Sequence, residues 1–361
     1  MATLEPCVKA KCPGGMGLNA LTGLAIAIAA IVCILPSDRG IIATAQASVA
    51  ENLAIPLPRP RPVIRVPRPR LGSFPGSTRV MEFESAPFPY DGKNPVTGKP
   101  FFNVFYEGRF GRRGARGQVY WENDTYTDPR VLLHIPKGFD IRKPAVIVVF
   151  FHGHGARIDR DVRDRQQVAA QITRSDANAV VVAPQFAVDA ADSSPGAFWE
   201  PGFIDEFLSE AAEQFALMLG QPKTVRTFFK MPIILVSYSG GYVPTAWALR
   251  LGHFKDRLRG IVLMDSLYGE LEQFEKWITS NRQGFFISGY LGSTRARNLE
   301  LQRDLAEKGI AIQKSLNGNI APGSVVFIQG HSEDSHRDYV TQAWTADPIA
   351  DILNRLPQYQ Q

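Results

Sequence analysis

The chain is poor in cysteine: it has three among 361 residues, and all three lie in the first 33 positions. Residues 34–361 therefore cannot form a disulfide, and zinc sites built on thiolates are excluded from them. Histidine is also scarce, at six residues. Stability has to come from a hydrophobic core, which a chain of this length with 45% hydrophobic residues can supply.

Outside one short segment the chain has little net charge. The formal charge is +5, and residues 56–70 contain five arginines and no acidic residue: Arg59, Arg61, Arg65, Arg68 and Arg70. Because the rest is close to neutral, we expect no nucleic-acid partner. The prolines between the arginines favour an extended, solvated chain, so residues 48–78 are interpreted as a Pro/Arg-rich linker. The more specific alternative is that this linker binds an anionic membrane or envelope surface through its arginines.

The first 47 residues predict a signal peptide. Lys9 and Lys11 precede an apolar run over residues 18–35, and small residues at A-x-A spacing follow near Ala45 and Ala47. We expect cleavage there and a periplasmic or secreted product. An uncleaved signal anchor is the alternative, because about 17 apolar residues are just enough to span a bilayer.

Residues 79–361 predict one α/β domain. Short β-branched or aromatic runs predict strands over 80–83, 101–105, 118–121 and 130–135, separated by turns that include 108–117. We interpret these four strands as an antiparallel N-terminal edge of the sheet. From residue 145 onward strands alternate with helices, which is typical of a mostly parallel sheet with helices on both faces. Strands are expected over 145–151, 179–183, 233–236, 260–264, 284–288 and 324–329. Helices are expected over 160–172, 202–219, 243–251, 271–278 and 294–308, and from 337 with a break at Asp347-Pro348.

A serine lies at the tip of the turn after strand 233–236. Ser237-Tyr-Ser-Gly-Gly241 connects this strand to a helix and matches the nucleophile elbow G-x-S-x-G, with Ser237 in place of the first glycine. Such a turn lifts Ser239 Oγ out of the sheet, and the following helix N-terminus favours negative charge. The alternative is an ordinary strand-to-helix turn with a capping serine.

Over roughly residues 131–356 the chain resembles the α/β-hydrolase superfamily, on this elbow and on the later acid and histidine. The resemblance implies a triad in the order Ser, acid, His, filled here by Ser239, Asp265 and His336. Asp265 ends strand 260–264, and its alternative role is the N-cap of the next helix. His331 is the alternative base, since both histidines follow the last strand.

The resemblance also implies an oxyanion hole made by two backbone N–H groups. Gly240 follows the serine, and His154 lies in His152-Gly-His-Gly155 after strand 145–151. The His-x-His spacing also suggests a metal. Ala156 and Arg157, however, occupy the positions where a metallo-β-lactamase-like site has an acid and a histidine. We therefore expect neither metal nor cofactor.

These features predict an exported serine hydrolase that cleaves an ester, or an amide, through an acyl-enzyme. The expected substrate is a small-molecule or lipid-like ester. The long loop 184–201 is expected to form a wall near the serine. Phe198, Trp199 and Tyr268 either line an acyl pocket or only pin this loop. The alternative function is a non-catalytic α/β-hydrolase-like binding domain tethered in the cell envelope.

Overall fold

The computed structural model describes residues 74–361 except Lys255, Ser332 and Glu333. The predicted leader and all but the last residues of the predicted linker lie outside these residues. The first strand begins at Ser77, two residues inside the range predicted as linker. No helix in the described part of the chain combines the length and the apolar character that a membrane crossing requires.

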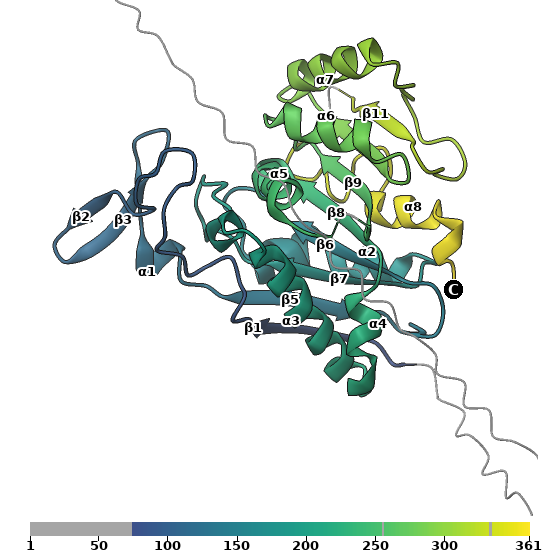
Figure 1. The fold of residues 1–361 in the computed structure, drawn as a ribbon, viewed down its shortest axis with the longest axis horizontal. Helices are drawn as coiled ribbons and strands as arrows, with labels where there is room; N and C mark the ends of the chain where they lie inside the picture. The colour runs from purple at the N-terminus through teal and green to yellow at the C-terminus, as the bar shows by residue number, and fades with distance from the viewer. Residues whose placement is uncertain (1–73, 255, 332–333) are drawn as a thin grey trace, which may run out of the picture. The chain divides into compact units, whose positions relative to one another are not determined.

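The domain is built on one eight-stranded sheet (Figure 1). The strand order across the sheet is β1-β5-β7-β6-β8-β9-β10-β11. β5 pairs antiparallel with both of its neighbours, and every pair from β7 to β11 is parallel. The strands are β1 (Ser77–Glu82), β5 (Arg130–Ile135), β6 (Val146–Phe151), β7 (Ala179–Pro184), β8 (Ile233–Tyr238), β9 (Leu258–Met264), β10 (Phe285–Tyr290) and β11 (Val325–Gln329).

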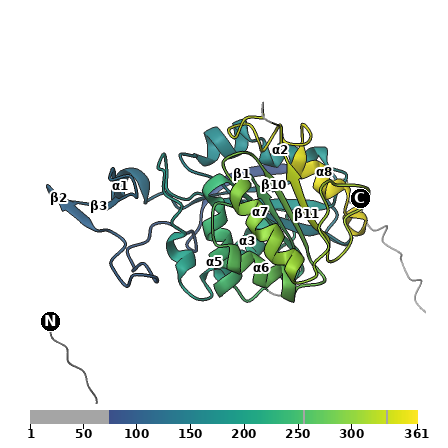
Figure 2. The same ribbon diagram turned by 90° about the horizontal axis from the view of Figure 1, so that it is seen from above.

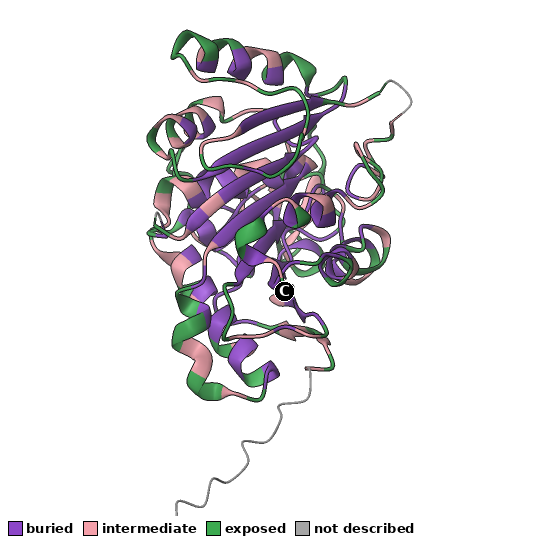
Figure 3. Cartoon of the chain, turned by 90° about the vertical axis from the view of Figure 1, so that its right-hand side faces the viewer, coloured by how far each residue is buried: buried purple, intermediate pink, exposed green. Residues whose placement is uncertain are grey.

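Alternate residues of each central strand enter different halves of the core. In β8, Ile233 and Leu235 pack on one face of the sheet, and Ile234 and Val236 pack on the other. This is the period-2 alternation of a strand covered on both sides. Figure 3 shows the sheet as the buried centre, with exposed residues on the outer sides of the helices.

Helices cover both faces of the sheet (Figure 2). One face packs against α3 (Phe203–Met218), α4 (Val225–Phe229), α5 (Tyr242–Leu251), α6 (Leu271–Ser280) and α7 (Arg295–Glu307). The other packs against the π-helix η1 (Ile158–Arg165), α2 (Val168–Arg174) and α8 (Pro348–Asn354). The prediction of a mostly parallel sheet with helices on both faces is thus confirmed.

The antiparallel N-terminal strands differ from the prediction. Only β1 and β5 join the central sheet. β2 (Val104–Tyr106), β3 (Arg109–Arg113) and β4 (Val119–Trp121) form a separate three-stranded sheet, with the short helix α1 (Glu122–Thr125) after it. Strand β3 occupies part of the range predicted as a turn, because its glycine and four charged or aromatic neighbours gave no buried, β-branched run. Figure 1 shows this small sheet projecting from the domain.

Two helix predictions also need correction. The single helix expected over 160–172 is divided into η1 and α2 at Gln167, whose φ is +51. The last helix begins at Pro348 rather than near Arg337, and residues 337–347 are turns and bends. Proline fits the first helical position because the N–H it lacks has no partner there. The expected break is therefore the helix start.

Candidate active site

The predicted elbow is present between β8 and α5. Ser239 has φ +53, in the left-handed region that non-glycine residues enter only at a cost. A Cβ placed on Gly241 would lie 2.4 Å from the carbonyl oxygen of Phe151. Only glycine at this position allows the turn to pass so close to the end of β6. Ser237 is buried, and its Oγ lies 3.2 Å from Ser266 Oγ, a polar contact that the usual first glycine could not make.

The structure brings Ser239, His336 and Asp265 together. Ser239 Oγ lies 2.9 Å from His336 Nε2, and His336 Nδ1 lies 2.5 Å from Asp265 Oδ2. An ionised carboxylate can only accept, so Nδ1 carries the proton and Nε2 is free to accept one from the serine hydroxyl. The three residues follow β8, β9 and β11, whose carboxyl ends share one edge of the sheet.

Asp265 is fully buried and its carboxylate has several donors. The backbone N–H of Leu291 donates to Oδ1 at 2.9 Å, and Thr294 Oγ1 donates to the same oxygen. Burial alone would raise the pKa of Asp265, but the hydrogen bonds from His336, Thr294 and Leu291 lower it below its ordinary value. Helix α6 is capped by Glu270, so Asp265 is not the N-cap that its position also suggested.

Contacts with Tyr238 and Arg165 hold the loop that carries His336. The ring of Tyr238 stacks on His336 with centroids 5.0 Å apart, and the Tyr238 hydroxyl donates to the His336 carbonyl at 2.8 Å. Arg165 donates to the carbonyl of Arg337 at 2.5 Å. The alternative base His331 is exposed, and its backbone N–H binds Asp334. The structure therefore places His336, not His331, against the serine.

The His-Gly loop after β6 lies directly against the elbow. A Cβ on Gly153 would lie 2.5 Å from Ser239 Cβ, so glycine is required there. A Cβ on Gly240 would lie 2.4 Å from Ser193 Oγ and 2.7 Å from His154 Cδ2. The predicted oxyanion residues Gly240 and His154 thus face each other beside Ser239. The ring of His154 also lies 2.6 Å from Ser193 Oγ, an added polar contact in the site.

His152 and His154 do not share a site. His152 is buried, and its Nε2 accepts the backbone N–H of Phe186 at 2.8 Å. Burial lowers the pKa of His152 to about 4. Among residues 74–361 with placed side chains, no group of three or more His, Cys, Asp or Glu residues has the arrangement of a metal site.

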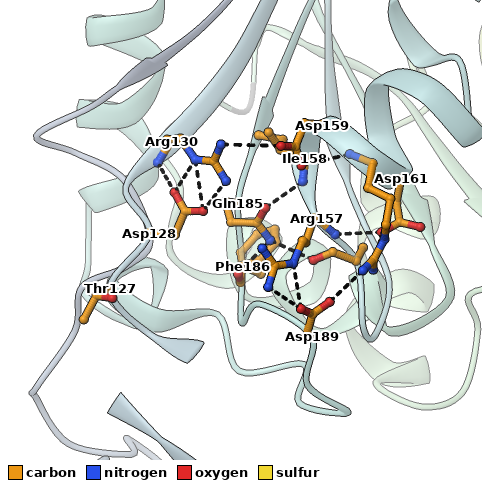
Figure 4. A network of polar contacts seen from close by, with 12 residues as sticks. Thr127, Asp128, Arg130, Arg157, Ile158, Asp159, Asp161, Gln185, Phe186 and Asp189 are labelled. Atoms are coloured by element: carbon orange, nitrogen blue, oxygen red, sulfur yellow. Dashed lines mark hydrogen bonds and ion pairs between the residues drawn. The ribbon is translucent and has the colours of Figure 1, made fainter. Parts of the chain in front are cut away.

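An ion-pair network borders the site on the η1 side (Figure 4). Asp161 accepts the backbone N–H of Arg157 at 2.8 Å and the Nε atoms of Arg160 and Arg165, each at 2.9 Å. Asp189 pairs with Arg157 at 2.6 Å and with Arg160 at 3.1 Å. Burial raises the pKa of Asp161, but these donors outweigh it and lower the value. Arg160 also donates to the carbonyl of Gly155 at 2.6 Å, so the network joins the His-Gly loop to the loop of His336.

A pocket of about 730 Å³ opens over Ser239. Its walls come from the elbow and the start of α5, the His-Gly loop, η1, the β3–β4 turn, the loops after β7 and β9, and the histidine loop. The lining residues are Arg116, His154, Arg160, Asp161, Arg165, Ser193, Tyr238, Ser239, Gly240, Tyr242, Tyr268, His336 and Arg337.

Loop 184–201 contributes less to this pocket than expected. Ser193 reaches the pocket, and Tyr268 lines it, as one of the two alternatives predicted. Phe198 and Trp199 are buried in the core, where Phe198 packs on Phe207 with centroids 5.3 Å apart. They pin the loop rather than line an acyl pocket.

Several polar residues of the site were not identified from the sequence. They are Ser193, Tyr238, Tyr242, Ser266, Thr294 and the pocket arginines. Tyr238 could have been recognised as a site residue from the sequence, because it directly precedes Ser239 in the elbow motif. Arg160 and Arg165 lie in residues 157–165, which are rich in both arginine and aspartate, and Arg116 ends residues 109–116, which contain four arginines. No spacing in these segments shows which of the arginines line the pocket.

Comparisons with known proteins give weak similarities. No family model matches the chain, and no curated protein matches it. A solved ferulic acid esterase superposes with a TM-score of 0.43 at 11% identity over 78% of this chain and 97% of its own. A feruloyl esterase module from Clostridium thermocellum superposes with a TM-score of 0.40 at 12% identity, over 75% of this chain and 96% of the module. An S-formylglutathione hydrolase from Agrobacterium tumefaciens superposes with a TM-score of 0.38 at 11% identity, over 71% of this chain and 98% of the hydrolase.

The strand order and strand directions of the central sheet identify the fold. Its eight strands have the order described above, with β5 alone reversed, and a strand–serine turn–helix elbow follows the central strand β8. An acid follows the next strand across the sheet, and a histidine follows the edge strand β11. By its topology the chain has the α/β-hydrolase fold.

Proposed function

We propose that this protein is an exported serine hydrolase that cleaves an ester bond through an acyl-enzyme. The observation that supports this most strongly is the hydrogen-bonded series from Asp265 through His336 to Ser239, with 2.5 Å and 2.9 Å between the bonded atoms. A buried carboxylate, an oriented imidazole and a serine on a strained turn are the parts that acyl transfer requires.

The chemistry follows from these positions. His336 Nε2 takes the hydroxyl proton as Ser239 Oγ attacks the ester carbonyl, and a tetrahedral intermediate forms with its negative charge on oxygen. The N–H groups of Gly240 and of the His-Gly loop stabilise that charge. His336 then gives the proton to the departing alcohol. Water, deprotonated by the same nitrogen, attacks the acyl-enzyme and releases the acid and free Ser239.

Asp265 acts through His336. Its carboxylate keeps the proton on Nδ1 and stabilises the imidazolium that forms in each half-reaction. Because hydrogen bonds hold its pKa below the ordinary value, Asp265 is ionised at neutral pH.

A fluorophosphonate probe tests the proposal directly. The folded protein should be labelled covalently on Ser239, and Ser239→Ala should not be labelled. The rival function is a non-catalytic binding domain of the same fold. Absence of labelling in wild-type protein that unfolds cooperatively would support that rival and reject the enzyme.

An ester-hydrolysis assay distinguishes the roles of the two histidines. We expect His336→Ala to lower kcat/KM on p-nitrophenyl acetate by about 10⁴-fold or more, since the triad acts as a unit. His331→Ala is the matched control and should stay within about threefold of wild type, as expected for an exposed surface change. The reverse result would transfer the role of base to His331.

A further inference from the structure

The walls of the pocket over Ser239 are strongly basic. Four arginines line it: Arg116, Arg160, Arg165 and Arg337. Among the described residues that line it, Asp161 is the one acidic residue. The arginines come from separate parts of the chain, namely the β3–β4 turn of the small sheet, η1 and the histidine loop. Positive charge is therefore gathered at the pocket by the fold rather than by one charged segment.

Two of these arginines already form ion pairs within the protein. Arg160 and Arg165 each bind Asp161 through Nε at 2.9 Å, and Arg160 also pairs with Asp189 at 3.1 Å. Their guanidinium groups additionally hold backbone carbonyls of the neighbouring loops. These contacts explain both arginines as structural parts of the site.

The other two arginines have no such explanation. Arg116 and Arg337 are exposed, and neither forms an ion pair with a carboxylate among the residues that the structure describes. Arg337 directly follows the base His336, and its backbone carbonyl is fixed by Arg165. Arg116 lies in the turn of the β3–β4 hairpin, which is part of the small three-stranded sheet. Both residues line the pocket beside the nucleophile, where an anionic ligand can reach their guanidinium groups.

The rest of the lining is polar as well. No aliphatic side chain occurs among the described residues that line the pocket, and its aromatic members are tyrosines. A long acyl chain would find little apolar surface here, whereas a short polar ester would keep its hydrogen bonds. The lining thus favours a charged substrate over the lipid-like ester expected from the sequence.

We propose that the ester cleaved at this site carries a carboxylate or phosphate a few bonds from the scissile carbonyl, and that Arg116 and Arg337 bind that anion. This rests on the proposed hydrolase function and specifies its substrate class. A guanidinium offers paired donors that match the oxygens of either anion. Binding the anion would position the ester carbonyl over Ser239.

Matched pairs of small esters test this inference. On the acyl side, p-nitrophenyl hydrogen glutarate is compared with p-nitrophenyl pentanoate, which has the same chain length without the charge. On the alcohol side, 4-acetoxybenzoate is compared with 4-acetoxybenzamide. All rates are corrected for spontaneous hydrolysis, with Ser239→Ala protein as the blank. We expect the anionic member of at least one pair to have a kcat/KM about tenfold higher at low salt, the size of one charged hydrogen-bonded contact.

The arginines are then tested through this preference ratio. Arg116→Gln and Arg337→Gln should each lower the ratio of anionic to neutral kcat/KM severalfold, and added salt should lower it in wild type because solvent-exposed charges are screened. Arg303→Gln removes the same charge from an exposed position on α7 and should leave the ratio unchanged.

The outcomes separate the two proposals. If both esters of each pair are hydrolysed equally, or the neutral one faster, the anionic substrate is rejected while the hydrolase stands. If the arginine variants slow both members of a pair by the same factor, the arginines serve the developing oxyanion, and the inference is again overturned. If no ester is hydrolysed and no fluorophosphonate is bound, the proposed function itself fails.

Discussion

Asp265 is buried beside His336, and its φ of +43 is, like that of Ser239, in the left-handed region. Residues stay in such conformations only where their surroundings hold them. For Asp265 the surroundings are Leu291 N–H, Thr294 Oγ1 and the imidazole. The carboxylate is thus aimed by contacts from the loop after β10, which no short sequence motif includes.

The hydroxyl of Thr294 provides a test at this scale. Thr294→Val keeps the shape but removes a donor to the buried carboxylate. The pKa of Asp265 should rise, the protein should lose about 1–3 kcal/mol of stability, and kcat/KM should fall about tenfold. Urea unfolding and ester hydrolysis measure the two effects. Thr294→Ser keeps the hydroxyl and should retain most of the stability and most of the kcat/KM of wild type. Equal losses in the valine and serine variants would show that packing, not the hydrogen bond, is responsible.

At the scale of elements, the site depends on how closely α5 approaches β6. The elbow passes the end of β6 at Gly241, where a Cβ would lie 2.4 Å from the Phe151 carbonyl oxygen. On the other side the His-Gly loop contacts Ser239 through Gly153. Two glycines at these contacts therefore set the distance between the nucleophile and the proposed oxyanion donors.

Gly241→Ala should therefore be costly. The added methyl group meets backbone rather than a flexible side chain, so α5 has to shift, with a loss of about 1–3 kcal/mol as in other overpacked sites. Because the shift moves Ser239, fluorophosphonate labelling should also slow strongly. Gly292→Ala is the control, since a Cβ there has no atom within 4 Å. Unfolding curves that coincide for wild type and Gly241→Ala would contradict the close approach.

At the scale of the whole molecule, two buried histidines link stability to pH. His134 is held in the core, with Thr78 Oγ1 2.7 Å from Nδ1 and Thr173 Oγ1 2.8 Å from Nε2. Burial lowers the pKa of His134 to about 4, and that of His152 to about 4 as well, from 6.5. Between pH 6.5 and 4 the unfolded chain binds more protons than the folded one, so stability falls as the pH falls through this window.

The expected loss is up to about 3 kcal/mol for each histidine on going from pH 7 to pH 4. Urea unfolding at several pH values above 4 measures it. Aspartates with lowered pKa, such as Asp265, contribute stability that is lost only at lower pH, below about 3.8 and on through the folded pKa. His134→Gln should flatten the dependence by removing one titrating group. An unfolding free energy independent of pH between 7 and 4.5 would reject the linkage.

The proposed export is a further prediction for the whole chain. Expressed from its full sequence in a bacterial host, the protein should be recovered outside the cytoplasm with its N-terminus near Ala45 or Ala47. Mass spectrometry of the purified product identifies that end. Recovery of the intact chain in the membrane fraction would instead favour the uncleaved signal anchor.

The sequence alone was enough for the features that arise from local pattern. Continuous apolar runs predicted the parallel strands, helical periodicity predicted α3, α6 and α7, and the small residues around Ser239 predicted the elbow. These signals are readable because burial on both faces of a sheet constrains every residue of a strand. Strands were predicted over 101–105 and 118–121, near β2 and β4, but β3 and the separation of these strands from the central sheet were missed, because exposed strands carry no such constraint.

The tertiary structure decided the features that depend on loop paths. His331 and His336 are five positions apart, and contacts of the histidine loop with Tyr238, Arg165 and Asp265 place His336 against Ser239. In the same way Arg116 reaches the pocket from a distant hairpin, and Phe198 and Trp199 turn into the core. Such placements depend on contacts between residues far apart in the chain, which local periodicity does not encode.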